Sequence, residues 1–335
     1  MATVLRYQEL RRPLVTGLLI LAVAAAYFTA GRIGLLRQVV VAGAKVTPLW
    51  PPTGIAVVCL LTLGLRIWPG IALGEFLVIV SIGPFSAASA AIVAGSTLAP
   101  VCAALLLRSV GFRLELDRLR DGVALVFLGA LGGMLISATT GTTALVLAGA
   151  LPLGEYWSTW SAWYAGDAMG VLVIAPLLLA ARTVRRPQDT SPFQWAEAAL
   201  LLAGTAFATV LVTRTSLDLL FLLFPLLIWS ALRFQLVGAA PCVLIVSVLT
   251  IIAATDFAGP FARQDILGIM VTLQALNGSA ALTTLLLAAV VTERKTTYRK
   301  IEQACQVLTE VVDRLAPGIS TQAWPPERDN GADKP

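Results

Sequence analysis

A series of apolar runs, most of them about 20 residues long, is the feature of this sequence that most constrains its fold. About 20 residues of helix cross the hydrocarbon core of a bilayer. Charged residues make up only 13% of the chain and the mean hydropathy is +0.84, whereas about a quarter of the residues of a soluble domain are charged. The runs have helical rather than alternating character, which argues against a barrel. We therefore predict an all-α polytopic membrane protein.

The chain is organised around residues 49–83, an apolar stretch of 35 residues that is too long for one simple span. Near its centre lies the sequence RIWPG, at residues 66–70. Arg and Trp settle at membrane interfaces, and a Pro–Gly pair stops a helix. The stretch therefore predicts a short helical hairpin, whose first arm begins at Trp50, Pro51 and Pro52 and whose second arm contains Glu75.

The remaining runs complete a bundle of about eight to ten transmembrane helices. They lie at residues 14–31, 85–107, 121–151, 159–181, 193–212, 219–232, 238–254 and 266–291. Residues 32–47 read as a polar connection. The run at 121–151 predicts one long helix, tilted or kinked at the Ser- and Thr-rich residues 137–143.

The distribution of basic residues predicts the orientation of the chain. They gather in the loops at 108–120 and 182–191 and in the tail, whereas the loops at 81–85, 152–158 and 255–265 contain only Arg263. The connection at 32–47 does not fit this pattern, because it would lie outside the cell and yet carries Arg32, Arg37 and Lys45. By the positive-inside rule we predict a multi-pass protein of the cell membrane with both termini in the cytoplasm.

Several classes of activity are excluded or unsupported. The chain contains no histidine, which excludes a phospho-accepting histidine, a histidine-based triad and histidine metal ligands. Its four cysteines are scattered without metal or disulfide spacing. We see no phosphate-binding loop, kinase motif or cyclase motif. We therefore expect no enzymatic activity, no cofactor or metal, and no nucleic-acid partner.

Two acidic residues in apolar runs, Glu75 and Asp167, are candidates for a functional site, because charges are expensive inside a bilayer. Asp167 is flanked by small residues that permit close helix packing. One interpretation is a polar pocket that biases the packing of the bundle. The alternatives are that Asp167 pairs with a structural donor, such as Arg233, a Trp indole or an exposed backbone amide, and that Glu75 is hydrated near the inner interface.

Two polar residues of the last run, Gln274 and Asn277, are three positions apart and therefore lie on one side of a helix. They line a cavity that acts on the tail, or they hold helices together by interhelical hydrogen bonds.

The tail after residue 293 shows a 3-4-3-4 spacing of apolar residues, which is typical of a short coiled-coil seam. The seam consists of Ile301, Ala304, Leu308, Val311 and Leu315. It predicts a cytoplasmic signalling helix that pairs in a homodimer; a helix that lies on the membrane or on the protein is the alternative. The polar residues 318–335 are expected to be disordered.

Five segments together resemble the MASE1 family, a bacterial integral-membrane sensory domain. They are WPPTGIA at 50–56, GLRIWPG at 64–70, WYAGDAMG at 163–170, FPLLIWSALRF at 224–234 and GPF at 259–261. The resemblance covers residues 14–293 and implies an input domain that passes an unknown signal to a cytoplasmic output module. Family members are usually fused to histidine kinases, diguanylate cyclases or phosphodiesterases, and this sequence ends about 40 residues after its last run.

We therefore expect a sensor domain at residues 1–293, a signalling helix at 294–317 and a disordered tail at 318–335, with a partner kinase or another signalling protein as the output. The rival interpretation is a small-molecule transporter or carrier, which builds its site from interrupted helices. The candidate sensing residues are Trp50, Pro51, Pro52, Glu75, Trp163, Asp167, Arg233, Gln274 and Asn277.

Overall fold

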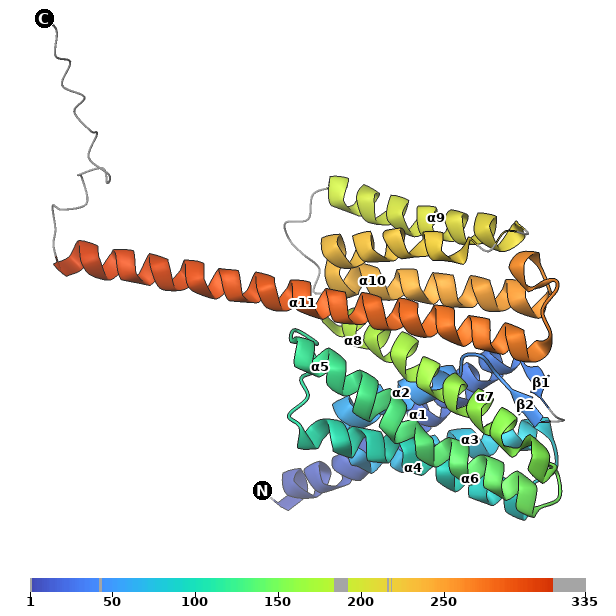
Figure 1. Cartoon of the computed structure of the whole chain (residues 1–335). Coiled ribbons are helices and arrows are strands. Elements are labelled where there is room, and N and C mark those ends of the chain that lie inside the picture. The colour runs from blue at the N-terminus through green and yellow to red at the C-terminus, as the bar shows by residue number, and fades with distance from the viewer. Residues whose placement is uncertain (1, 42–43, 184–191, 216, 218, 316–335) are drawn as a thin grey trace, which may run out of the picture. The chain divides into compact units, whose positions relative to one another are not determined.

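The computed structural model describes residues 2–41, 44–183, 192–215, 217 and 219–315, and these fold almost entirely into helices (Figure 1). Eight helices in this part of the chain are long and apolar enough to cross a membrane, and one further apolar helix is shorter. The prediction of an all-α polytopic membrane protein is confirmed. The chain divides into two compact units, Met1–Val291 and Thr292–Pro335.

The first part of the chain contains α1 (Ala2–Leu35), β1 (Val39–Val41), β2 (Ala44–Val46), α2 (Pro51–Leu63), α3 (Trp68–Ile82), α4 (Ala87–Ser109), α5 (Leu119–Ala124) and α6 (Gly133–Leu147). A π-helical segment, Leu125–Gly132, joins α5 to α6 into one span. The second part contains α7 (Tyr156–Met169), a π-helical segment at Gly170–Ile174, α8 (Ala175–Thr183), α9 (Pro192–Arg214), α10 (Leu223–Thr255) and α11 (Ile266–Leu315).

The helical hairpin predicted at residues 49–83 is formed by α2 and α3. Gly64 ends α2 with a φ of 95°, a conformation that favours glycine, and a short 3₁₀ turn then leads into α3. Pro69 lies in the first turn of α3, where its missing N–H costs no hydrogen bond. The arm α3 packs mainly on α1 and α4, whereas α2 packs on the π-helical segment Gly170–Ile174 as well as on α1 and α4.

The chain reverses direction inside α10. Gln235 has non-helical backbone angles there, with a φ of 54°. Leu220, shortly before α10, follows the end of α9 closely in sequence, and Gly259, shortly after α10, packs directly on the carbonyl oxygen of Thr213. Both ends of α10 therefore lie near the same end of α9, and Figure 1 shows its two arms side by side. These arms correspond to the separate runs predicted at 219–232 and 238–254.

Two local predictions were wrong. The connection at residues 32–47 is not simply polar loop: β1 and β2 form an antiparallel hairpin in which Val39 pairs with Val46, consistent with the preference of valine for strands. The irregularity of the span Leu119–Leu147 lies in its π-helical segment and not at residues 137–143. That Ser- and Thr-rich stretch stays helical, and the hydroxyl of Thr140 donates to the carbonyl of Ile136 at 2.7 Å.

Two further predictions fall on residues outside the described ranges: the disorder of 318–335 and most of the basic loop at 182–191.

Candidate functional site

A cavity of about 370 Å³ lies between the ends of several helices and the segment that joins β2 to α2. Its walls come from α1, α3, α4, α6 and α7 and from residues 46–50. Ile82, Pro84 and Ala150, at the rim, are exposed where α3 and α6 end, so the cavity opens at that end of the bundle. We call it the carboxyl cavity, because two buried carboxyl groups line it.

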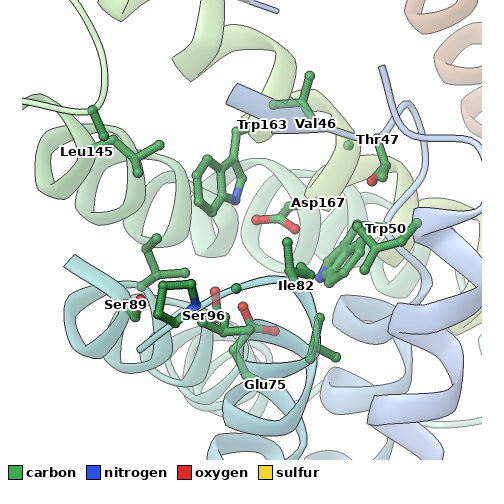
Figure 2. A pocket seen from close by; sticks show the side chains of 18 residues that line it. Val46, Thr47, Trp50, Glu75, Ile82, Ser89, Ser96, Leu145, Trp163 and Asp167 are labelled. Atoms are coloured by element: carbon green, nitrogen blue, oxygen red, sulfur yellow. The ribbon is translucent and has the colours of Figure 1, made fainter. Parts of the chain in front are cut away.

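Four of the candidate residues meet in the carboxyl cavity: Trp50, Glu75, Trp163 and Asp167. Glu75 is 4% exposed and Asp167 is 2% exposed, and the two are close enough to interact electrostatically. Figure 2 shows both carboxyl groups turned toward the same space, with the two indoles on either side of Asp167. Residues more than 90 positions apart in the sequence, Glu75 and Asp167, thus share one pocket.

The carboxyl groups have few polar neighbours. Glu75 lies beside the hydroxyl groups of Tyr27 and Ser96, and Asp167 lies beside Ser137 and the indole of Trp163. Among the described residues, Oε2 of Glu75 and Oδ2 of Asp167 have no hydrogen-bond partner. Since a buried polar atom without a partner costs about 1–3 kcal/mol, and a charged one more, these oxygens are available to a bound group.

Glycines bring α7 and the start of α2 into direct backbone contact and so position Asp167. A Cβ atom on Gly166 would lie 2.3 Å from the carbonyl oxygen of Thr47, and one on Gly170 would lie 1.9 Å from that of Trp50. The close approach permits two hydrogen bonds. The N–H of Trp50 donates to Gly166 O at 3.0 Å, and the hydroxyl of Thr53 donates to Asp167 O at 2.9 Å.

Pro51 and Pro52 do not line the cavity but begin α2 directly after Trp50. A proline in the first turn fixes the backbone in helical geometry and leaves no N–H without a partner. The two prolines therefore hold Trp50 at the fixed end of a helix.

The polar residues of α11 reach the same region. The amide of Gln274 donates from Nε2 to the carbonyl oxygen of Pro48 at 3.4 Å, within the segment that forms one wall of the cavity. Asn277 is buried and accepts a hydrogen bond from the hydroxyl of Thr250 at 3.5 Å. Gln274 thus contacts the segment that carries the lining residues Thr47 and Trp50, while Asn277 links α11 to α10.

The structure corrects two interpretations of the charged residues. Arg233 does not pair with Asp167; its Nε and Nη2 donate to the two carboxylate oxygens of Glu197, each at 2.8 Å. Glu75 is not hydrated at an inner interface, because it is buried and faces a cavity that opens where α3 ends.

Sequence reasoning missed Tyr27, Ser96 and Ser137, which surround the two carboxyl groups. Tyr27 is fully buried and lies beside Trp50 and Glu75. A tyrosine inside the first apolar run was a usable signal. Serines in apolar runs are too common to be one, since most of them bond to their own helix.

The predicted signalling residues lie on α11 in the second unit. The side chains of Ile301, Ala304, Leu308 and Val311 are exposed, and Leu315 is the last residue of the helix. Over the described residues, no three histidine, cysteine or acidic side chains gather as a metal site.

The profile of the MASE1 family matches residues 19–295, which is most of the chain. Comparison with curated proteins and with solved structures found no match. The matched range contains every described lining residue of the carboxyl cavity, and it runs from within the first candidate span, Leu14–Leu35, to within the last, Gly268–Val311. The chain therefore belongs to MASE1, a family of membrane-associated sensory domains.

Proposed function

We propose that this chain is a sensory input domain whose signal acts at the carboxyl cavity and leaves through α11. The observation that carries the proposal is the contact of Gln274 with Pro48: one helix touches the segment that carries the lining residues Thr47 and Trp50, and it continues to Leu315. A change at Glu75 or Asp167 that moves residues 46–50 would thereby act on α11.

A signal can shift this bundle only if it favours one packing of the helices over another. Two features support such a shift. The start of α2 meets Gly166 and Gly170 through close backbone contacts, and Asp167 lies three residues before the π-helical segment Gly170–Ile174. Segments of π-helix are frequent at functional sites. A shift or rotation of α11 would be the output of the domain.

In the orientation predicted from the basic residues, both termini lie in the cytoplasm and the cavity opens toward the outside of the cell. The rim residues Pro84 and Ala150 lie in or next to loops that are poor in basic residues. In this arrangement the domain receives a signal from outside and presents its output helix to the cytoplasm.

The output is a homodimeric helix that acts on a partner kinase or another signalling protein. The exposed apolar residues Ile301, Leu308 and Val311 support pairing, because a coiled-coil seam buries such residues against a second copy. The two carboxyl groups serve sensing in this proposal, and no catalytic step is assigned to them.

Cysteine crosslinking along residues 301–315 in native membranes tests the signalling helix. Crosslinks that peak at Ile301, Ala304, Leu308, Val311 and Leu315 are expected. A flat profile, with the protein correctly inserted, would contradict a dimeric output helix.

The reversal inside α10 and the short α2 favour a second candidate, a small-molecule transporter or carrier, because transporters build their sites from interrupted helices. Uptake and efflux assays in proteoliposomes distinguish the two. Saturable flux of a ligand that binds the cavity would support transport, whereas binding without flux supports sensing.

A further inference from the structure

We infer that the carboxyl cavity binds a small organic cation, an ammonium group carried on an apolar body. The inference deepens the proposed function, because it names the class of signal molecule that the input site accepts.

The charges of the cavity favour a cation. Glu75 and Asp167 are its two acidic lining residues, and no described residue that lines it is basic. The arginines nearest in sequence to its walls are engaged elsewhere: Arg32 donates to the hydroxyl of Ser81 at 3.0 Å, and Arg37 pairs with Asp256 at 2.6 Å. When ionised, two buried carboxylates with no basic group among the described side chains of the lining are strongly destabilising, and a bound cation relieves that cost.

The hydrogen-bonding atoms suit an ammonium group. Oε2 of Glu75 and Oδ2 of Asp167 are both buried acceptors without partners among the described residues. They come from α3 and α7, on two walls of one cavity (Figure 2). A primary ammonium carries three donors and can serve both oxygens, which exchanges two unsatisfied acceptors for charge-assisted hydrogen bonds.

The aromatic side chains point to the same chemistry. Trp50 and Trp163 both line the cavity and lie beside Asp167. The face of an indole attracts a cation, most strongly where water is excluded, and cages of aromatic rings with acidic groups recognise alkylated ammonium ions.

The remaining walls select an apolar body on the ligand. Val46, Val78, Ile79, Ile82, Ile92 and Leu145 line the cavity. Its volume of about 370 Å³ is at the lower end of the range for small-molecule sites, about 300–1,000 Å³. Such walls offer little to a hydrated metal ion, which takes several oxygen ligands, and the described residues contain no cluster of three metal-ligating side chains.

The test is calorimetric titration of the purified full chain in lipid nanodiscs with benzyltrimethylammonium, phenethylammonium and putrescine. 2-Phenylethanol serves as the neutral counterpart of phenethylammonium, and calcium chloride as the inorganic cation. We expect saturable binding of at least one aromatic ammonium compound, at least tenfold tighter than that of 2-phenylethanol or calcium.

Variants locate the binding. Glu75→Gln and Asp167→Asn should each weaken it at least tenfold, while Glu155→Gln, which removes an exposed acidic group at the start of α7, should leave it unchanged. The comparison of cation with neutral counterpart uses the wild-type chain, so the test holds even if a variant fails to fold. Failure of both aromatic ammonium compounds to bind, equal binding of 2-phenylethanol, or full affinity in both folded variants would overturn the inference.

The outcomes that would overturn the proposed sensory function differ from those that would overturn cation binding. If the cations bind but the output helix does not respond, the cavity is a cation site without a sensory role. If they do not bind but Asp167→Asn alters the output helix, the domain is a sensor of another signal.

Discussion

Replacing Gly170 by alanine tests whether the backbone contact between α7 and the start of α2 holds the cavity together. A Cβ atom there would lie 1.9 Å from the carbonyl oxygen of Trp50 and 2.3 Å from the hydroxyl of Thr53. Real Cβ atoms essentially never approach another atom below 3.0 Å. The two segments must therefore separate by about 1 Å, into tightly packed surroundings.

The free-energy cost has two parts. Overpacking a well-packed interior costs about 1–3 kcal/mol. Separation also weakens the hydrogen bonds from Trp50 N–H to Gly166 and from the Thr53 hydroxyl to Asp167, each with a net value of about 1 kcal/mol. Alanine is favoured over glycine within a helix by about 1 kcal/mol, which offsets part of the loss. We expect Gly170→Ala to lower the free energy of unfolding by about 2–4 kcal/mol.

The assay is unfolding in mixed micelles by titration with sodium dodecyl sulfate, followed by circular dichroism. Gly204→Ala is the matched control, because Gly204 lies within α9 and a Cβ atom there would meet nothing within 4 Å. The control should be as stable as wild type or slightly more stable. Equal stability of Gly170→Ala and Gly204→Ala would refute the close packing on which the geometry of the cavity depends.

Three further outcomes follow from the structure. Double-mutant cycles of Arg233→Ala with Glu197→Ala should give a coupling energy below about 1 kcal/mol, because the side chains of Arg233 and Glu197 are 46% and 19% exposed. A larger coupling energy would contradict the assignment of this ion pair to the periphery of the bundle. Trp163→Leu should weaken phenethylammonium binding about tenfold, whereas Trp157→Leu, at an exposed tryptophan, should not; equal effects would count against a cation–π contact. Gln274→Leu should preserve cation binding within about threefold but abolish the change that a bound cation causes in the signal of a spin label on Cys305. Ser279→Ala, at an exposed serine of the same helix, should preserve both the binding and the change in signal. A full change in signal in Gln274→Leu would exclude the contact with Pro48 as the link.

Hydropathy predicted most of the fold, because the bilayer imposes helices of a known length. The hairpin at 49–83 and the two arms of α10 were both visible as broken apolar runs. The strands β1 and β2 were not predicted, because a three-residue strand is shorter than any reliable alternating pattern. The π-helical segment Leu125–Gly132 was missed as well, since its residues are ordinary helix formers and its geometry depends on the packing around it.

The sequence identified the members of the cavity but not their grouping. Charges inside apolar runs singled out Glu75 and Asp167 individually. The grouping of Asp167 with Trp50 depends on Gly166 and Gly170, whose role appears only when the carbonyl oxygens of Thr47 and Trp50 are seen against them. The predicted partner of Arg233 was wrong as well. An ion pair depends on which helices are neighbours, and hydropathy does not specify the neighbours.

The most direct test of the central claim measures the output helix while the cavity is altered. Cys305 is an exposed native cysteine of α11, and Cys59, Cys102 and Cys242 can be replaced by alanine so that it alone carries a spin label. Electron paramagnetic resonance then gives the distribution of distances between the two labels of a dimer in membranes. The account predicts that Asp167→Asn shifts this distribution and that Glu155→Gln leaves it as in wild type, with all three proteins equally inserted and folded. Identical distributions in wild type and Asp167→Asn would contradict a cavity that controls the output helix.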